Sequence, residues 1–223
     1  MKLAMLEALI AARTAKQPVA LATWLDGSDQ QLLAPVKAPV ELADTVAEVL
    51  RLDAAKVVET ARGMVLVEPH NPPLRLIIVG AVHVAEPLSK MAALVGFAVT
   101  IVDPRRSWAT PARFPDQALV IEWPETALAT LAPDPRTAVV TLTHDPKLDD
   151  PALIAALASP AFYLGCLGSK KTHASRLERL AAAGCTRLER LHGPVGLSIG
   201  AKSPAEIAVS IFAEIIATLR GAA

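Results

Sequence analysis

The sequence of residues 74–105, LRLIIVGAVHVAEPLSKMAALVGFAVTIVDPR, has the pattern of a strand, a tight turn, a helix and a second strand. Residues 74–79 are a short, largely apolar run typical of a buried strand, and Gly80 follows where the chain must turn. Apolar residues recur at spacings of three and four across residues 85–95, which indicates a helix with one apolar face. Residues 97–102 form the second apolar run. Two parallel strands joined by a helical crossover open a Rossmann-type sheet, which binds ligands at the carboxyl ends of its strands.

The turn in this unit departs from the usual dinucleotide-binding fingerprint, G-x-G-x-x-G/A. Residues 80–85 read GAVHVA, so Gly80 and Ala85 keep the first and third small positions, whereas Val82 replaces the middle glycine. A β-branched side chain at that position obstructs the approach of the backbone to a pyrophosphate. The stretch therefore predicts the Rossmann architecture and makes NAD(P) the less favoured ligand.

The composition fits a folded protein and disfavours several classes of function. Of the 223 residues, 52% are hydrophobic and 20% are charged, and the formal net charge is zero, so no basic face predicts nucleic-acid binding. Zero net charge favours burial of surface in an oligomer, and we expect a homodimer. The two cysteines cannot form a disulfide framework, and no apolar run reaches the roughly 20 residues of a membrane span. We expect a cytoplasmic protein.

The chain is expected to fold as two units. Residues 1–70 combine helical patterns with strand patterns at 19–24 and 63–67, which predicts a small α+β unit. Residues 68–73, EPHNPP, contain three prolines and predict a stiff, extended connection. Residues 71–223 alternate apolar strands with helices, which predicts a Rossmann-like, doubly wound parallel sheet.

Polar residues follow the first two strands of this sheet, and they should meet at one edge because parallel strands place their carboxyl ends together. Gly80 and His83 follow the first strand, where the start of a helix favours an anion, although His83 has an equal claim as a turn residue. Asp103 and Arg105 follow the second. An acidic residue there commonly receives a ribose hydroxyl and an arginine pairs with phosphate, while the alternative is an Asp-Pro turn with a solvated arginine.

Two later strand ends add to the predicted site. Thr143 and His144 directly follow a buried strand, which makes them candidates for contact with a polar ligand. The sharpest signal is the stretch GCLGSKKTH, residues 165–173, in which Gly168 makes a turn and hydroxyl and lysine residues open a helix. Ser169 is expected to cap that helix. Its free N–H groups, with Lys170 or Lys171, would cradle a phosphate; a plain cap with solvated lysines is the alternative.

A fifth loop, GPVGLSIGAKSPAE at residues 193–206, precedes the last helix. Ser203 and Glu206 have the spacing of a capping box. The upstream glycines, among them Gly196 and Gly200, exceed what a cap requires and indicate backbone that lies against a ligand or a neighbouring loop.

Cys166 raises the question of a metal, because a thiol near the site could contact a soft metal such as molybdenum. We favour a buried core cysteine. Neither a Tyr-x-x-x-Lys motif nor a Cys/His catalytic pair is evident.

Four stretches resemble the XdhC/CoxI family, in the family's order, from about Gly63 to the C-terminus. They are VEPHNPPLRLIIVGAVHVA at 67–85, THDPK at 143–147, FYLGCLGSKKTHASRLERL at 162–180 and LHGPVGLSIGAKSPAEIAVSIFAEII at 191–216. These are accessory proteins for xanthine dehydrogenase and related molybdenum hydroxylases. The resemblance implies a protein that binds the molybdenum cofactor, protects it while its sulfido ligand is installed, and hands it to the apo-enzyme, with a cysteine desulfurase as a second partner.

A molybdopterin carries a phosphate, or a pyrophosphate in its dinucleotide form, on a polar pterin. This chemistry suits the site predicted above, with helix N-termini and lysines for the phosphate and His and Thr for the pterin. The chain departs from the family at Val82, where relatives have glycine, and at Ser198, where they have aspartate. Its N-terminal unit looks abbreviated, without the glycine-rich, cysteine-containing segment of many relatives. We expect a cofactor chaperone without chemistry of its own; the alternative is an NAD(P)-dependent oxidoreductase on the same fold.

Overall fold

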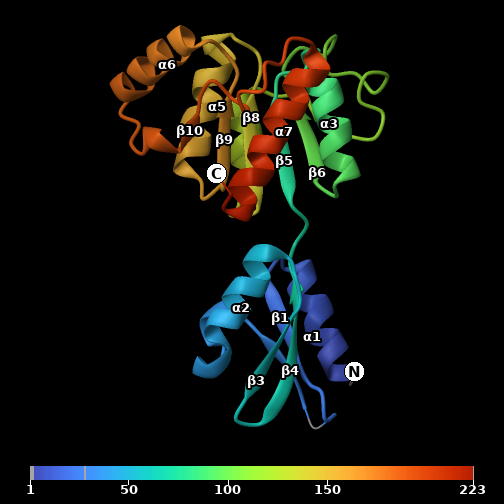
Figure 1. Cartoon of the computed structure of the whole chain (residues 1–223). Coiled ribbons are helices and arrows are strands. Elements are labelled where there is room, and N and C mark those ends of the chain that lie inside the picture. Colours follow the sequence, from blue (N-terminus) through green and yellow to red (C-terminus); the bar gives the residue numbers. More distant parts are fainter. Residues whose placement is uncertain (1–2, 28, 223) are drawn as a thin grey trace. The chain divides into compact units, whose positions relative to one another are not determined.

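A computed structural model describes residues 3–27 and 29–222, which divide into two compact units, Met1–Pro72 and Pro73–Ala223 (Figure 1). The first unit contains a four-stranded antiparallel sheet in the order β2-β1-β4-β3, with two α-helices. This confirms the predicted α+β class. Its elements are α1 (Leu3–Thr14), β1 (Val19–Trp24), β2 (Gln30–Leu33), the 3-10 turn η1 (Pro35–Lys37), α2 (Val40–Leu52), β3 (Lys56–Thr60) and β4 (Gly63–His70).

The core of the first unit lies between α2 and the sheet. Leu42, Val46 and Val49 occupy one face of the helix and pack with Trp24 and Val65 of the strands. The helical spacing of these three residues explains why α2 was predictable from the sequence.

One prediction for this unit is wrong. Glu68, Pro69 and His70 were expected in the connection, but they belong to β4, where His70 pairs with Val19. The pairing of β3 with β4 ends at Val67, so β4 has a neighbour on one side only beyond that residue. Proline has no backbone N–H, and it is tolerated at such an edge because no second strand requires a hydrogen bond from it.

The second unit is the predicted Rossmann-like, doubly wound sheet. Its six strands are parallel, in the order β10-β9-β8-β5-β6-β7. The strands are β5 (Arg75–Val79), β6 (Ala98–Val102), β7 (Ala118–Val120), β8 (Thr137–Thr141), β9 (Tyr163–Cys166) and β10 (Leu191–His192); the helices are α3 (Ala85–Leu94), α4 (Pro124–Leu131), α5 (Pro146–Ala158), α6 (Lys170–Ala182), η2 (Leu188–Arg190) and α7 (Pro204–Arg220).

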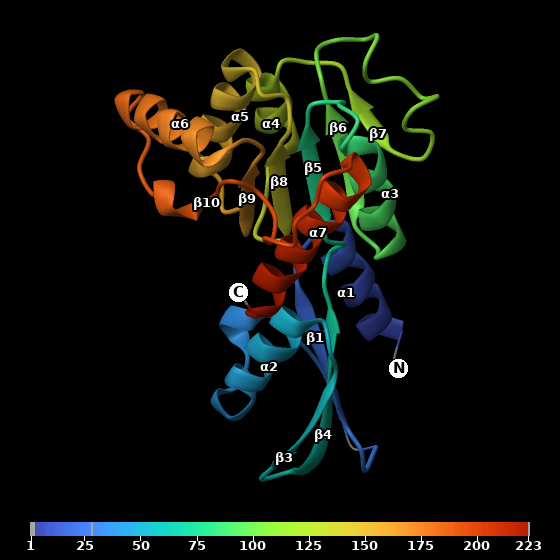
Figure 2. The ribbon, with the colours of Figure 1, turned by 45° about the horizontal axis from the view of Figure 1, so that its top comes forward.

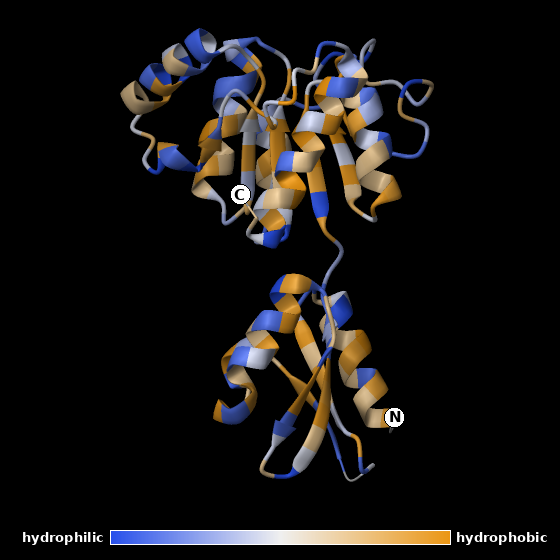
Figure 3. Cartoon of the chain, in the orientation of Figure 1, coloured by the Kyte–Doolittle hydropathy of each residue, from blue (hydrophilic) through white to orange (hydrophobic). Residues whose placement is uncertain are grey.

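Helices cover both faces of this sheet. Helices α3 and α7 lie on one face, and α4, α5 and α6 on the other (Figures 1 and 2). Strand β5 therefore alternates between two cores: Leu76 and Ile78 face α3 and α7, whereas Ile77 and Val79 face the opposite helices. Figure 3 shows how apolar residues concentrate in these strands. Burial on both faces is the reason for the apolar run in the sequence.

The order of the strands locates the ligand-binding edge. From β5 the chain proceeds to β6 and β7 on one side and then returns to add β8, β9 and β10 on the other. This reversal creates a switch point between β5 and β8, where open α/β sheets bind ligands at the carboxyl ends of the strands. No helix in the described part of the chain is both long and apolar enough to cross a membrane.

Candidate functional site

The glycine turn after β5 lies against the loop after β8. Gly80 has a φ of +107°, and a Cβ at this position would stand 2.6 Å from Cγ2 of Thr143. The fold therefore brings these two predicted site residues into contact, and only glycine meets both demands. Val82 is half-buried and packs against the core under α3. His83 is exposed, two residues before α3 begins, with its Nδ1 3.9 Å from Oε1 of Glu86.

Asp103, at the end of β6, is fully buried and surrounded by donors. Its Oδ2 accepts from the backbone N–H of Ala81 (2.8 Å) and from Nη2 of Arg105 (2.7 Å). Its Oδ1 accepts from the backbone N–H (2.9 Å) and the Nε (2.8 Å) of Arg105. Burial alone raises the pKa of Asp103, but the hydrogen bonds from Arg105 and Ala81 outweigh it and bring the pKa below its ordinary value.

These four hydrogen bonds use the acceptor positions of the carboxylate. Asp103 thus clamps the glycine turn to the end of β6, and the geometry does not favour its expected role as a ribose acceptor. The guanidinium of Arg105, the other predicted residue here, also lies over the ring of Trp108, 4.2 Å from its centroid. Arg105 is therefore engaged within the protein as well.

Arg113 is a structural residue of this region that the sequence did not single out. Its Nη1 donates to the carbonyl oxygens of Ala81 and Trp108, at 2.7 Å each, and its Nε donates to Oε1 of Glu86 at 2.8 Å. It lies in the polar loop after β6, 32 residues from Ala81, so no local pattern marks it.

The loop after β8 is held by a buried acid. Oγ1 of Thr143 donates to Oδ1 of Asp149 at 2.6 Å, and the backbone N–H of Thr143 donates to the same oxygen at 3.3 Å. His144 has a φ of +63° and an exposed side chain. Asp145 caps α5 by accepting from the backbone N–H of Lys147. Thr143 is thus fixed in place, whereas His144 faces solvent.

The loop after β9 has the predicted cap. Ser169 accepts from the backbone N–H of Thr172 at 3.1 Å, and α6 starts at Lys170, so Lys170 and Lys171 lie exposed in its first turn. Gly168 has a φ of +148°, and a Cβ there would stand 3.2 Å from Cβ of Thr172. The turn therefore packs closely on the start of the helix.

Cys166 lies in the core beneath this loop. Its side chain is fully buried, and burial is the main cause that raises the pKa of the thiol to about 12. Cys166 packs among apolar side chains with no exposed surface, so the geometry favours the core interpretation. Within residues 3–27 and 29–222, no group of three His, Cys, Asp or Glu side chains is placed to hold a metal ion.

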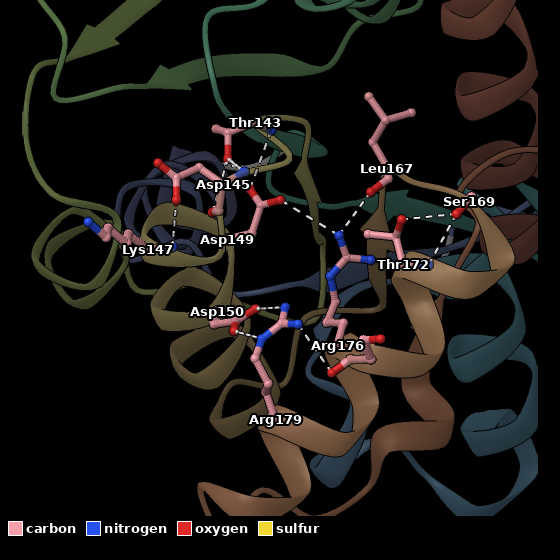
Figure 4. A network of polar contacts seen from close by, with 11 residues as sticks. Thr143, Asp145, Lys147, Asp149, Asp150, Leu167, Ser169, Thr172, Arg176 and Arg179 are labelled. Carbon is pink, nitrogen blue, oxygen red and sulfur yellow. Dashed lines mark hydrogen bonds and ion pairs between the residues drawn. The ribbon is translucent and has the colours of Figure 1, made fainter.

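A cavity of about 260 Å³ opens between the first turn of α5 and the N-terminal half of α6. Figure 4 shows the polar contacts of several residues in this region. We name it the α5–α6 cavity. Two predicted residues, His144 and Lys171, line it together with residues that the sequence analysis missed, Asp149, Thr172, Ser175, Arg176 and Arg179 among them.

Arg176 and Asp149 form a loose buried pair at this cavity. Arg176 is 2% exposed, and its Nη2 donates to the carbonyl oxygen of Leu167 at 2.9 Å and lies 3.7 Å from Oδ2 of Asp149. The pair thereby connects the loop after β8 with the loop after β9. Burial is the main cause that raises the pKa of Asp149, against the opposing effects of Thr143 and Arg176.

The last glycine loop packs on α7. Gly196 has a φ of +98°, and a Cβ there would stand 2.3 Å from Oγ of Ser210. Its backbone N–H donates to Oε2 of Glu214 at 2.8 Å. Gly200, with a φ of +75°, faces open space, and Ser203 forms the predicted capping box at the start of α7. Gly196 therefore packs on helix α7, whereas the sequence analysis expected a ligand or a neighbouring loop against this backbone.

Comparison with known proteins identifies the family. A family model described as the XdhC Rossmann domain matches residues 76–215, which is more than half of the chain. The chain belongs to the XdhC family. The match begins inside β5 and ends inside α7, so the XdhC Rossmann domain coincides with the six-stranded unit.

Curated relatives of this XdhC chain include two Escherichia coli proteins and one from Bacillus subtilis. A protein named uncharacterized protein YqeB is 32% identical over 154 residues, covering 68% of this chain and 28% of that protein. The Bacillus protein, named as a probable xanthine dehydrogenase subunit, is 37% identical over 150 residues (66% and 44%). The protein named molybdenum cofactor insertion chaperone PaoD is 34% identical over 147 residues (65% and 40%). The matches span less than half the length of each curated relative.

A solved structure extends the similarity to both units of the XdhC chain. It is described as a xanthine dehydrogenase from Bacillus halodurans and superimposes with a TM-score of 0.71 at 26% identity. The match covers 98% of this chain and 64% of that chain.

Proposed function

We propose that this chain is an accessory protein that binds the molybdenum cofactor and delivers it to a molybdenum hydroxylase of the xanthine dehydrogenase type. The carrying observation is its 34% identity, over 65% of the chain, to a protein named a molybdenum cofactor insertion chaperone. The Bacillus relative named for xanthine dehydrogenase supports the same class of recipient.

The sheet edge offers groups suited to the parts of this cargo. The N-terminal turns of α5 and α6, with Lys171 and Arg176, would hold its phosphate, and Thr143 and His144 would contact the polar pterin. Two guanidinium nitrogens of the buried Arg176, Nε and Nη1, have no acceptor in the part of the chain that the structure describes, which fits an anionic ligand. The cofactor supplies molybdenum chemistry to the recipient enzyme, while residues of this chain bind and orient it.

The alternative function, an NAD(P)-dependent oxidoreductase, has weaker support. The carboxylate of Asp103 is occupied by donors from Arg105 and Ala81, and Val82 obstructs the fingerprint turn. The single tyrosine, Tyr163, is buried and donates to Glu214. Titration calorimetry with NAD(P)H is expected to show no saturable heat, and binding below about 100 μM would favour the oxidoreductase.

The experiment that tests the proposal is purification from two strains, one able and one unable to make the molybdenum cofactor. Protein from the first strain is expected to carry molybdenum by elemental analysis and to release a pterin that fluoresces after oxidation. Protein from the second strain should carry neither and should take up cofactor released from another enzyme. A preparation from the first strain without metal or pterin, combined with no uptake, would overturn the proposal.

The proposal includes the partners and state expected from the sequence: an apo molybdenum hydroxylase, a cysteine desulfurase, a homodimer and a cytoplasmic location. Light scattering during size-exclusion chromatography measures the mass in solution against the 23.4 kDa of one chain. Pull-down of the purified apo-enzyme, compared with the cofactor-loaded enzyme, measures the first association. Pull-down of the purified desulfurase measures the second.

A further inference from the structure

We infer that the α5–α6 cavity is a binding site for a tetrahedral oxyanion of the phosphate class, held by Arg176 and Lys171. This inference deepens the proposed function. The identification of the anion as the phosphate of the molybdenum cofactor rests on that function. The anion site itself is argued from the contacts, charge and size of the cavity.

The first argument is the state of Arg176. Its side chain is 2% exposed, yet its Nε and Nη1 have no hydrogen-bond partner among residues 3–27 and 29–222, and neither does Oδ2 of Asp149. The distance of 3.7 Å between Nη2 and that oxygen is too long for a hydrogen bond. A buried guanidinium whose Nε and Nη1 lack acceptors is costly, and an oxyanion supplies several acceptors in the geometry that the planar fork of arginine matches.

The second argument is the balance of charge at the cavity. The guanidinium of Arg179 is neutralised by Asp150, with contacts of 2.6 and 3.0 Å. Lys171 forms no ion pair with any residue that the structure describes, so it contributes an uncompensated positive charge. Both α5 and α6 begin at the cavity, and the N-terminal end of each helix attracts negative charge.

The third argument concerns Asp149, whose carboxyl would repel an anion if it were ionised. Its Oδ1 accepts twice from Thr143, while its Oδ2 faces Arg176 without a partner. Burial raises the pKa of Asp149, so the ionised carboxylate is less favoured here than in solvent. When Oδ2 carries a proton, this group donates a hydrogen bond to the anion.

The size of the cavity limits what it holds. About 260 Å³ lies below the roughly 300–1,000 Å³ of pockets that enclose a drug-sized ligand. It accommodates a phosphate group with a few waters, each of which occupies about 30 Å³ in the liquid. The remainder of a larger ligand would lie outside, toward Thr143 and His144.

The test uses the full chain purified without cofactor, titrated with inorganic phosphate and with pyrophosphate by calorimetry at an ionic strength held constant with chloride. Lys171→Ala is expected to weaken binding roughly tenfold, because it removes a charge-assisted contact. The matched control is Lys147→Ala, which removes the same charge from the exposed first turn of α5 but lies outside the cavity lining (Figure 4). It should change affinity less than twofold.

A second variant, Arg176→Lys, keeps the charge but removes the planar fork, and is expected to weaken phosphate binding at least fivefold while circular dichroism stays unchanged. Absence of saturable binding above the chloride background would overturn the inference, as would equal losses in the Lys171 and Lys147 variants. Saturating phosphate that blocks uptake of released molybdenum cofactor would identify the cargo as the source of the anion. Phosphate binding without such competition would support a separate phosphate ligand in the same cavity.

The two proposals fail separately. A chain that carries molybdenum cofactor but binds no phosphate keeps the proposed function and loses the anion site. A chain that binds phosphate with the expected response to Lys171→Ala, yet never carries cofactor, keeps the anion site and loses the proposed function.

Discussion

Each half of the sheet edge contains a buried aspartate, and the two aspartates differ in their hydrogen bonding and in the direction of their pKa shifts. At the ends of β5 and β6, Asp103 accepts four hydrogen bonds, and its pKa is lowered. Beyond the ends of β8 and β9, Asp149 in α5 has one oxygen with no hydrogen-bond partner among the described residues, lies 3.7 Å from Nη2 of Arg176, and has a raised pKa. The first half is complete by itself and stabilises the fold, whereas the second lacks partners that a ligand can supply.

The largest expected effect comes from breaking the complete half. Asp103→Ala should lower the free energy of unfolding by about 3 kcal/mol, because it leaves the N–H of Ala81 and the side chain of Arg105 without their acceptor. Urea unfolding followed by circular dichroism measures the loss. Asp116→Ala, at an exposed position, is the control and should cost less than about 0.5 kcal/mol. A loss below about 1 kcal/mol for Asp103→Ala would show that the clamp contributes little.

The contact between the two halves is tested at Gly80. Gly80→Ala combines a strained positive φ with a clash against Thr143, and should cost about 2 kcal/mol or more. Gly96→Ala is the matched control, because Gly96 has a φ of +95° with open space around its Cβ position. The difference between the two losses in urea unfolding isolates the clash. Equal losses would mean that the loop after β8 moves away from the turn at little cost.

The incomplete half should tolerate the loss of its charge. Arg176→Met keeps an extended apolar side chain and removes the unpartnered nitrogens, and the raised pKa of Asp149 lowers the cost of leaving its carboxyl without the guanidinium. The expected loss of unfolding free energy is about 1 kcal/mol or less, clearly smaller than for Asp103→Ala. Thermal unfolding with and without phosphate provides the second measurement, since phosphate should stabilise the wild-type chain and not the variant. A loss as large as that of Asp103→Ala would make the two halves equivalent.

The pH dependence of stability should have opposite signs at the two aspartates, with effects of about 1 kcal/mol. A lowered pKa means that the contribution of Asp103 is complete above the unfolded value, near pH 4, and is lost as pH falls through the folded value. The wild-type advantage over Asp103→Asn should therefore shrink below about pH 4.

The raised pKa of Asp149 has the reverse consequence. Its contribution is complete below the unfolded value, near pH 4, and is lost as pH rises through the folded value. The stability of Asp149→Asn relative to the wild type should therefore increase as pH rises above about 4. Urea unfolding across this range, with Asp116→Asn as the control, measures both trends. Parallel trends at the two sites would contradict the contrast between them.

Much of the architecture was predictable because it depends on neighbours in the sequence. The apolar run at β5 marks a strand buried on both faces, and Ser169 and Ser203 mark the starts of α6 and α7. The two-residue strand β10 and the polar strands β2 and β3 were missed, because their identity as strands depends on pairing with partners elsewhere in the chain.

Local patterns and ordered motifs were enough to predict the Rossmann unit, its family and the strand ends that could carry a ligand. Which charged groups are available to a ligand depends on contacts that form in the folded chain. Asp103 meets the backbone of Ala81 across 22 residues, and Asp149 meets Arg176 from a neighbouring helix. Hydrogen bonds and burial depend on groups that are distant in the chain. For this reason the structure shows Asp103 as a clamp, and it places Arg176, which the sequence analysis did not single out, at the centre of a candidate anion site.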